Sequence, residues 1–280
     1  MQLDPEDQYR RAVEFARLHQ GERAFVLVNA WDAGSARLLW QSGFPALATT
    51  SAGLAFSLGR PDGENLVRRA EALENARSIV AATPLPVSGD LESCYADSVE
   101  GVARTIRLAA EAGLVGASIE DATADPDEPI RPVTEAAERV AAAVEAAREL
   151  PFPFTVTARA ENFLYGRGDL KDTIARLQAY EAAGADVLYA PALPGLDAIR
   201  AVRAAVDKPL NVLAGAAASV DELSAAGADR ISVGSAFARA ALGAFVEAAL
   251  EVRDHGTFSF AQRALDYGEA NERMSAPPSA

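Results

Sequence analysis

Acidic side chains recur where apolar, strand-like segments of the chain end. Asp90 is the last residue of one such segment, residues 86–90, and Glu92 follows two positions later. Glu120 is the last residue of the next segment, residues 117–120. In extended backbone Asp90 and Glu92, two positions apart, point to the same face. Carboxylates from neighbouring strands repel each other unless a cation lies between them, and all-oxygen ligands suit a hard divalent ion. The pattern therefore favours a site for Mg²⁺, or alternatively Mn²⁺. The other interpretation is that these residues are solvated charges at strand ends.

A single basic residue, Arg159, ends a predicted strand, residues 154–159. Thr157 and Glu161 are each two positions away from it, so extended backbone places all three on one face. A guanidinium fork can bind a carboxylate through two hydrogen bonds, as an anionic substrate requires; a plain salt bridge to the acidic residues is the alternative. The small, hydroxyl-rich segment 49–54 exposes backbone N–H groups that suit a carboxylate or phosphate oxygen, although such segments are commoner as plain turns.

Histidine, lysine and cysteine chemistry is disfavoured by position. His19 lies in the first predicted helix and His255 near the end of the chain, away from predicted strand ends, which argues against a zinc site or a Ser-His-Asp triad. Lys171 and Lys208 also lie outside those ends, so a Schiff-base aldolase lacks an obvious nucleophile. Cys94 is the single cysteine, and one cysteine excludes an intrachain disulfide.

Short strand-like segments alternate with helical segments, and this alternation must position the candidate residues. The predicted strands are residues 24–29, 46–50, 86–90, 117–120, 154–159, 187–190, 210–213 and 230–233. The predicted helices are residues 33–42, 64–82, 97–112, 133–149, 170–183, 196–205, 220–226 and 236–252. Eight such units predict a single closed (β/α)₈ TIM barrel of parallel strands. An open doubly wound sheet is less consistent, because no G-x-G-x-x-G turn follows the first strand.

The segments outside the barrel are short. We assign residues 1–22 to an N-terminal helix, 23–253 to the barrel, and 254–280 to a C-terminal helix and tail, all within one domain spanning 1–280. A barrel does not need the extra helix at 259–271, so we expect it to pack against a neighbouring subunit or to cap an end of the barrel.

The charge balance narrows the choice of partners. The chain has 26 basic and 40 acidic residues, a net charge of −14. An acidic surface repels phosphate backbones and anionic lipids, so we expect neither nucleic acid nor a membrane as a partner. The first residues lack the basic and apolar regions of a signal peptide, and no apolar run reaches the roughly 18–20 residues that span a bilayer. We therefore expect a cytoplasmic protein.

At these residues the sequence resembles the isocitrate lyase/phosphoenolpyruvate mutase superfamily, in a branch similar to carboxyphosphonoenolpyruvate phosphonomutase. The resemblance extends from residue 29 to about residue 241, over the motifs 49–54 with 58–62, 90–92, 119–121 and 157–159. It implies that Asp90 binds Mg²⁺ directly and that Asp62, Glu92 and Glu120 act through waters.

The resemblance also implies a substrate site and an assembly. Thr50, Ser51 and Ala52 would hold the substrate carboxylate together with Arg159, beside Asp90. The eighth barrel helix would be exchanged between the subunits of a homodimer or homotetramer.

Two segments depart from the family pattern. Glu92 stands where the family usually has the second Asp of Asp-x-Asp. The gating loop at 122–132 lacks both the Cys of the lyases and the Lys and Asn of the mutases, and Glu128 falls near the place of that catalytic Cys or Asn. We therefore expect Glu128 or Thr123 to supply or orient a proton donor.

These features together predict a Mg²⁺-dependent lyase for a small 2-oxo acid or related dicarboxylate. The acid would chelate the metal through its keto and carboxylate oxygens, and breaking the bond at the third carbon, by C–C cleavage or decarboxylation, would leave a metal-stabilised enolate. Arg159, Glu128 and Thr123 would have the catalytic roles. Three alternatives stay open: a phosphonopyruvate hydrolase or phosphonomutase, a sugar-phosphate aldolase or epimerase using residues 213–215 and 233–235, and a 2-oxo acid binding protein without turnover.

Overall fold

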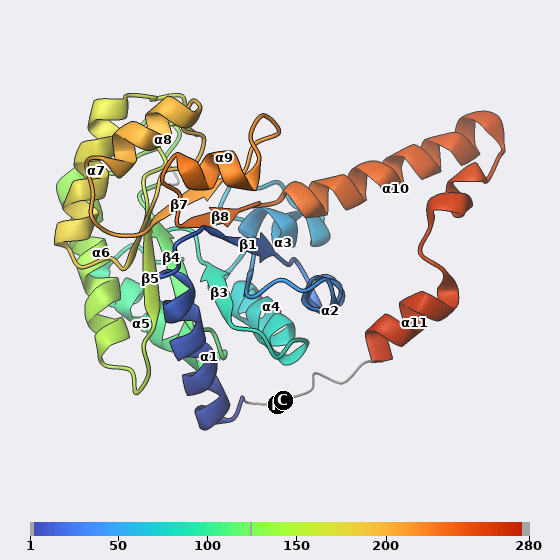
Figure 1. Ribbon diagram of the computed structural model, residues 1–280, viewed down its shortest axis with the longest axis horizontal. Coiled ribbons are helices and arrows are strands. Elements are labelled where there is room, and N and C mark those ends of the chain that lie inside the picture. Colours follow the sequence, from blue (N-terminus) through green and yellow to red (C-terminus); the bar gives the residue numbers. More distant parts are fainter. Residues whose placement is uncertain (1–2, 124, 276–280) are drawn as a thin grey trace.

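The computed structural model describes residues 3–123 and 125–275, and its centre is a closed barrel of eight parallel strands. The strands follow one another in chain order, and β8 pairs back onto β1 (Figure 1). They are β1 (Phe25–Asn29), β2 (Leu47–Ala48), β3 (Val87–Asp90), β4 (Gly116–Glu120), β5 (Thr155–Arg159), β6 (Val187–Tyr189), β7 (Leu210–Leu213) and β8 (Arg230–Ser232). Each predicted strand overlaps an observed one, and the predicted TIM barrel is confirmed.

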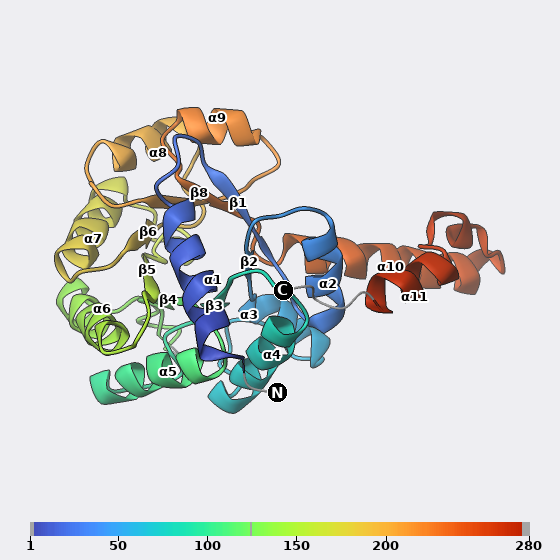
Figure 2. The same ribbon diagram turned by 60° about the horizontal axis from the view of Figure 1, so that its bottom comes forward.

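A ring of helices surrounds the strands (Figure 2). Except for α10 (Ala236–His255), which projects outward, the helices that follow the strands form this ring: α2 (Ala33–Gln41), α4 (Arg69–Ala81), α5 (Val99–Glu111), α6 (Val133–Arg148), α7 (Leu170–Ala182), α8 (Leu196–Arg203) and α9 (Val220–Ala225). Their apolar faces pack on outward-facing strand residues such as Val156, Leu188 and Ile231, which are fully or almost fully buried. This outer layer is the main hydrophobic core.

The segment after β2 differs from the prediction. A short helix, α3 (Ser51–Ser57), begins directly after the strand, where the sequence favoured a turn. Thr50 caps this helix because its hydroxyl accepts a hydrogen bond from the N–H of Gly53 at 3.2 Å. The next helix begins at Arg69 and not at residue 64, so the predicted first turn of that helix was wrong.

The first helix, α1 (Pro5–Leu18), lies across the amino ends of the strands. Its Phe15 packs edge-on against His19 and Phe25, with ring centroids 5.0 and 6.3 Å away. A Cβ on Gly116, the first residue of β4, would lie 3.1 Å from the Phe15 ring and 2.8 Å from the Thr155 carbonyl oxygen. Only glycine therefore fits where α1 closes this end of the barrel.

The inside of the barrel is polar. Alternate strand residues point inward, and the inward-facing set includes Asn29, Ser88, Ser118, Thr157, Asn211 and Ser232. Barrel interiors are usually filled by Val, Ile and Leu. A polar interior leaves room for a hydrophilic cavity that extends from the carboxyl ends down toward the floor.

The C-terminal segment projects from the barrel. Helix α10 extends away from it, and the chain returns through a 3₁₀ turn, η1 (Ser259–Arg263), and α11 (Tyr267–Ser275) toward α2 (Figure 1). The extra helix predicted at 259–271 is thus split in two. Gly256 ends α10 in the left-handed conformation, at φ 62°. Within residues 3–123 and 125–275, no helix is long and apolar enough to cross a membrane.

Candidate active site

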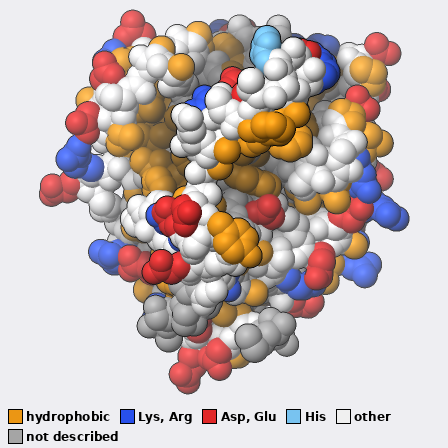
Figure 3. Space-filling view, turned by 90° about the vertical axis from the view of Figure 1, so that its right-hand side faces the viewer, with side chains coloured by type: hydrophobic (Ala, Val, Ile, Leu, Met, Phe, Trp, Pro, Cys, Tyr) orange, Lys and Arg blue, Asp and Glu red, His pale blue; other side chains and the backbone are white. Residues whose placement is uncertain are grey.

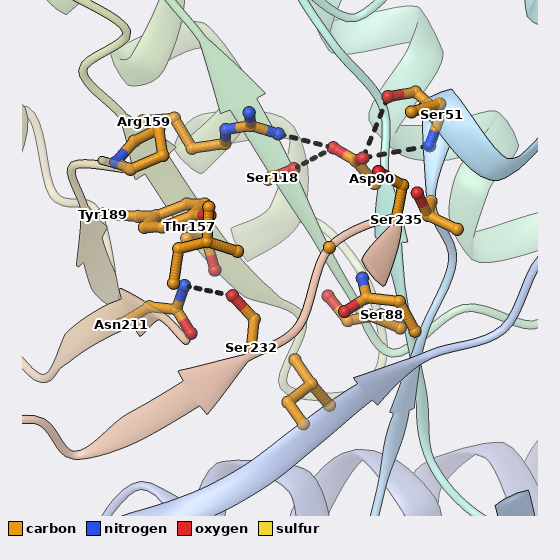
Figure 4. Close-up of a pocket in the computed structure, with 18 of the residues that line it drawn as sticks. Ser51, Ser88, Asp90, Ser118, Thr157, Arg159, Tyr189, Asn211, Ser232 and Ser235 are labelled. Carbon is orange, nitrogen blue, oxygen red and sulfur yellow. Dashed lines mark hydrogen bonds and ion pairs between the residues drawn. The ribbon is translucent and has the colours of Figure 1, made fainter. Parts of the chain in front are cut away.

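Asp90 lies at the carboxyl end of β3 and faces a cavity of about 240 Å³ (Figure 4). One carboxylate oxygen accepts hydrogen bonds from the N–H and the hydroxyl of Ser51, both at 3.0 Å. The other accepts from the Ser118 hydroxyl at 3.2 Å and from Arg159 Nη1 at 2.7 Å. Strands β3, β4 and β5 and helix α3 thus meet at one carboxylate.

Arg159, at the end of β5, is surrounded by three acidic side chains. Its Nη1 lies 2.7 Å from Asp90 and 3.2 Å from Glu120, and its Nε donates to Glu161 at 2.9 Å. The guanidinium also stacks over the Tyr189 ring, 5.1 Å from its centroid. Burial alone would lower the pKa of Arg159, but the surrounding carboxylates raise it well above its ordinary value. Arg159 therefore remains a fixed positive charge.

A second cavity, of about 160 Å³, adjoins the first and is acidic. Its lining includes Ser51, Asp62, Glu92, Glu120, Thr123, Arg159, Glu161 and Tyr165. Burial and repulsion from Asp90 and Asp62 raise the pKa of Glu92 to about 7. Burial and the charge of Asp90 also raise the pKa of Asp62. The positive charge near Asp62 and Glu92 does not offset burial and the repulsion between carboxylates. A bound cation would therefore stabilise the ionised forms of both side chains.

The backbone conformation that places Glu92 in this cavity differs from the predicted extended strand. Strand β3 ends at Asp90, and Glu92 adopts a left-handed conformation with φ 49°, so the two residues do not share a face of extended backbone. In the described part of the chain, no three His, Cys, Asp or Glu side chains are close enough to hold a metal ion together. Mg²⁺ needs no such cluster, because it commonly binds one or two carboxylates and keeps several waters. The donor set fits Mg²⁺ in that form.

A buried network that the sequence did not reveal supports the ends of β4 and β5. Asp121 accepts hydrogen bonds from the Tyr180 hydroxyl at 2.6 Å, from Arg176 at 3.0 Å and from the N–H of Glu161 at 2.8 Å. Asp121 is 2% exposed, so these contacts replace its hydration. The network fixes the backbone on both sides of the Arg159–Glu120 pair.

Thr123 and Glu128, the two residues of the gating loop that we expect to act in catalysis, differ in their position relative to the cavities. The Thr123 side chain lines the acidic cavity, and its hydroxyl donates to the Glu128 carbonyl at 2.6 Å. The Glu128 side chain is exposed and lines neither cavity. Tyr165, which the sequence analysis did not single out, lines the acidic cavity, and burial together with Glu120 and Glu161 raises its pKa to about 12. Its hydroxyl keeps its proton at neutral pH.

The predicted carboxylate-binding residues lie together at the start of α3. Thr50, Ser51 and Ala52 all line the larger cavity. The Thr50 hydroxyl is used in capping the helix and the Ser51 N–H in binding Asp90. The N–H of Ala52 lies in the first turn, where a helix offers no internal acceptor. Among the described residues, the backbone N–H groups of Thr50 and Ala52 have no acceptor, so both are free for a ligand.

Comparison with known proteins agrees with this geometry. A family model described as phosphoenolpyruvate phosphomutase matches residues 15–253, most of the chain. The chain belongs to this family. A family relative, the 2-methylisocitrate lyase of Shewanella oneidensis, is 29% identical over 205 residues, 71% of this chain and 68% of that protein. Relatives of this kind make the chain an enzyme of the isocitrate lyase/phosphoenolpyruvate mutase superfamily.

Solved structures of family relatives superpose closely on the barrel. A protein of Burkholderia cenocepacia J2315 described as a lyase/mutase is 55% identical, with a TM-score of 0.94 over 98% of this chain and 100% of that one. Oxaloacetate acetylhydrolase, solved with its product oxalate, is 26% identical, with a TM-score of 0.85 over 95% of this chain and 94% of that one. The superfamily predicted from the sequence motifs is confirmed.

Proposed function

We propose that the protein is a Mg²⁺-dependent lyase that cleaves a bond at the third carbon of a small 2-oxo acid. The observation that carries the proposal is the pairing of Asp90 with Arg159 and Ser51 at the rim of the cavity. It places a carboxylate suited to a hard cation beside a guanidinium and a helix start suited to a substrate carboxylate. A relative that binds oxalate, a compact dicarboxylate, supports this class of ligand.

The metal would be held mainly by Asp90, with Asp62, Glu92 and Glu120 acting through waters. Mg²⁺ bound there would polarise the keto oxygen and stabilise the charge that develops on it when the bond breaks. Ser51 and Ser118 hold the Asp90 carboxylate from both sides, so its position is set before substrate arrives.

The substrate carboxylate would lie between Arg159 and the N–H of Ala52. Arg159 is held on its other edge by Glu161 and against the Tyr189 ring, which limits the orientations of its fork. A guanidinium oriented in this way binds a planar carboxylate with little loss of side-chain freedom.

The proton donor of the proposed reaction would belong to the gating loop. Glu128 stays our prediction from the loop, and it requires that the loop move over the cavity. Thr123 already lines the acidic cavity and orients the loop through its hydrogen bond to the Glu128 carbonyl. Substitution of Glu128 by Gln tests the first role, because unchanged turnover would eliminate it.

A substrate screen tests the proposed reaction. Purified protein with Mg²⁺ is assayed against pyruvate, oxaloacetate, 2-oxoglutarate, phosphonopyruvate, isocitrate and methylisocitrate, with Asp90→Asn as the matched variant. We expect turnover of one carboxylate substrate, lost with EDTA and reduced at least about 10²-fold in the variant. Release of phosphate from phosphonopyruvate alone would favour C–P chemistry instead. Metal-dependent binding without any turnover would favour a binding protein.

We also propose that α10 is exchanged between copies of the chain in a homodimer or homotetramer. Ala238 is the one α10 residue that is buried, whereas Phe245 is 70% and Val246 52% exposed. Viewed from the α10 side, hydrophobic side chains gather over the middle of the face and charged ones lie mostly at its margin (Figure 3). An apolar centre with a charged rim is typical of interfaces between subunits.

A further inference from the structure

A second arginine lies inside the barrel, below the proposed catalytic groups. Arg230, the first residue of β8, is 4% exposed. It donates to Asn211 Oδ1 at 2.8 Å, to Thr157 Oγ1 at 3.0 Å and, through Nη1, to His19 Nε2 at 3.2 Å. Within the described residues it forms no ion pair. Buried charged side chains are almost always paired, so Arg230 is an exception that calls for a partner.

All three contacts of Arg230 are to neutral groups. The Nδ1–H of His19 donates to the Phe15 carbonyl at 2.8 Å, which leaves Nε2 as the acceptor toward Arg230. Burial and the charge of Arg230 lower the pKa of His19 to about 3, so the imidazole is uncharged at neutral pH. Burial lowers the pKa of Arg230 to about 9, which still leaves the guanidinium protonated. The floor of the barrel therefore carries an uncompensated positive charge.

Arg230 lines the same cavity as Asp90 and Arg159. Thr157, which contacts Arg230, is two residues before Arg159 on β5, and both side chains face the barrel interior, so the contact of Arg230 lies one inward-facing layer, about 6.6 Å along this strand, below the position of Arg159. The wall between them is polar: Asn211 donates to the Ser232 hydroxyl at 3.0 Å (Figure 4). A short, polar ligand can reach both layers within a cavity of about 240 Å³.

The guanidinium also has donors to spare. It carries five N–H groups, and the contacts to Asn211, Thr157 and His19 use three of them. The remaining two have no acceptor among the described residues. A carboxylate supplies the negative charge and the acceptor oxygens that are both absent here.

We propose that Arg230 binds the distal carboxylate of a dicarboxylic 2-oxo acid, whose 2-oxo acid end lies above it at Arg159 and Ser51. The assignment rests on the proposed function, and it restricts the substrate class to acids with a second carboxylate. Arg230 is then a specificity residue, which selects a dicarboxylate over the same acid ending in a methyl group.

Matched pairs of acids test this selection. Oxaloacetate and 2-oxobutyrate differ in the distal carboxylate, as do 2-oxoglutarate and 2-oxopentanoate. Dissociation constants are measured by calorimetry with Mg²⁺ at constant ionic strength. For the unsubstituted protein we expect at least a tenfold preference for the dicarboxylate in one pair. For Arg230→Met, we expect this preference to disappear while the affinity for the monocarboxylate stays the same.

A second variant, Asn211→Asp, keeps the test valid if Arg230→Met does not fold. In the unsubstituted protein, Asn211 Oδ1 accepts a hydrogen bond from Arg230 Nε. Asn211→Asp puts a carboxylate of nearly the same shape at this position and so supplies an internal counter-ion for Arg230. We expect this variant to fold, to gain thermal stability and to lose the same preference. A preference for the dicarboxylate that survives both substitutions would overturn the proposal.

The remaining outcomes separate this inference from the proposed function. If the unsubstituted protein binds both members of each pair equally, Arg230 is structural and the subsite is refuted while the proposed function stands. If it binds no 2-oxo acid with Mg²⁺, the proposed function and the distal-carboxylate assignment both fail. In that case, the Tm is measured with and without chloride at constant ionic strength. An increase in Tm with chloride that is absent in Arg230→Met would show that Arg230 binds a free anion.

Discussion

Acid sensitivity of folding should depend on one buried imidazole, His19. This side chain is 9% exposed, donates from Nδ1 to the Phe15 carbonyl and accepts from Arg230 at Nε2. Protonation of His19 would put a second positive charge against Arg230 and remove the acceptor. Burial and Arg230 therefore lower the pKa of His19 to about 3 in the folded protein.

The size of the effect follows from the difference between the folded and unfolded pKa. An unfolded histidine titrates near pH 6.5, so between pH 6.5 and 3 the unfolded chain binds a proton that the folded chain does not. The stability due to neutral His19 is fully present above pH 6.5 and is lost as the pH falls toward 3. At pH 5 the loss relative to pH 7.5 is about 2 kcal/mol of unfolding free energy.

Urea unfolding at pH 7.5 and pH 5 measures this loss. We expect the unsubstituted protein to lose about 2 kcal/mol more than His19→Gln over this interval, because the carboxylates titrate alike in both. The matched control is His255→Gln at the exposed end of α10, which should behave as the unsubstituted protein does. Equal losses in His19→Gln and the unsubstituted protein would refute the assignment of a neutral, buried imidazole.

Three further substitutions test other parts of the structure. Tyr180→Phe removes the 2.6 Å hydrogen bond to buried Asp121 and should lower the unfolding free energy by about 1–3 kcal/mol in urea; no change would mean that the network does not hold the ends of β4 and β5. Gly116→Ala places a Cβ 2.8 Å from a backbone oxygen, so calorimetry should show a lower Tm and a loss of about 1–3 kcal/mol; an unchanged Tm would contradict the close packing. Phe245→Glu should shift the assembly toward monomers in light scattering, whereas an unaltered mass would argue against α10 as an interface.

Much of the architecture follows from local patterns in the sequence. Strand positions could be predicted because apolar β-branched runs alternate with Ala-rich helices that end in Gly, as at Gly113 and Gly184, which both adopt positive φ. Asp90 and Arg159 could be located because strand ends in a barrel face a common site. These inferences need only the spacing of residues along the chain.

Other parts of the site depend on contacts between distant segments. Arg230 is recognisable as an unpaired charge only after closure of the barrel brings it to His19, 211 residues away in the chain. The left-handed backbone at Glu92 breaks the period of two that the prediction assumed. Helix α3 was missed because its hydroxyl-rich start has the composition of a turn, and its cap at Thr50 is visible only in three dimensions.

The central claim is that Asp90 and a bound metal hold a small dicarboxylate or 2-oxo acid at the rim of the barrel. Calorimetric titration with oxalate, with and without Mg²⁺, tests it most directly, with Asp90→Asn as the matched variant. We expect oxalate to bind the unsubstituted protein in the presence of Mg²⁺, and the binding to be lost both without the metal and in the variant. Oxalate binding of equal strength without Mg²⁺, or in Asp90→Asn, would contradict the account.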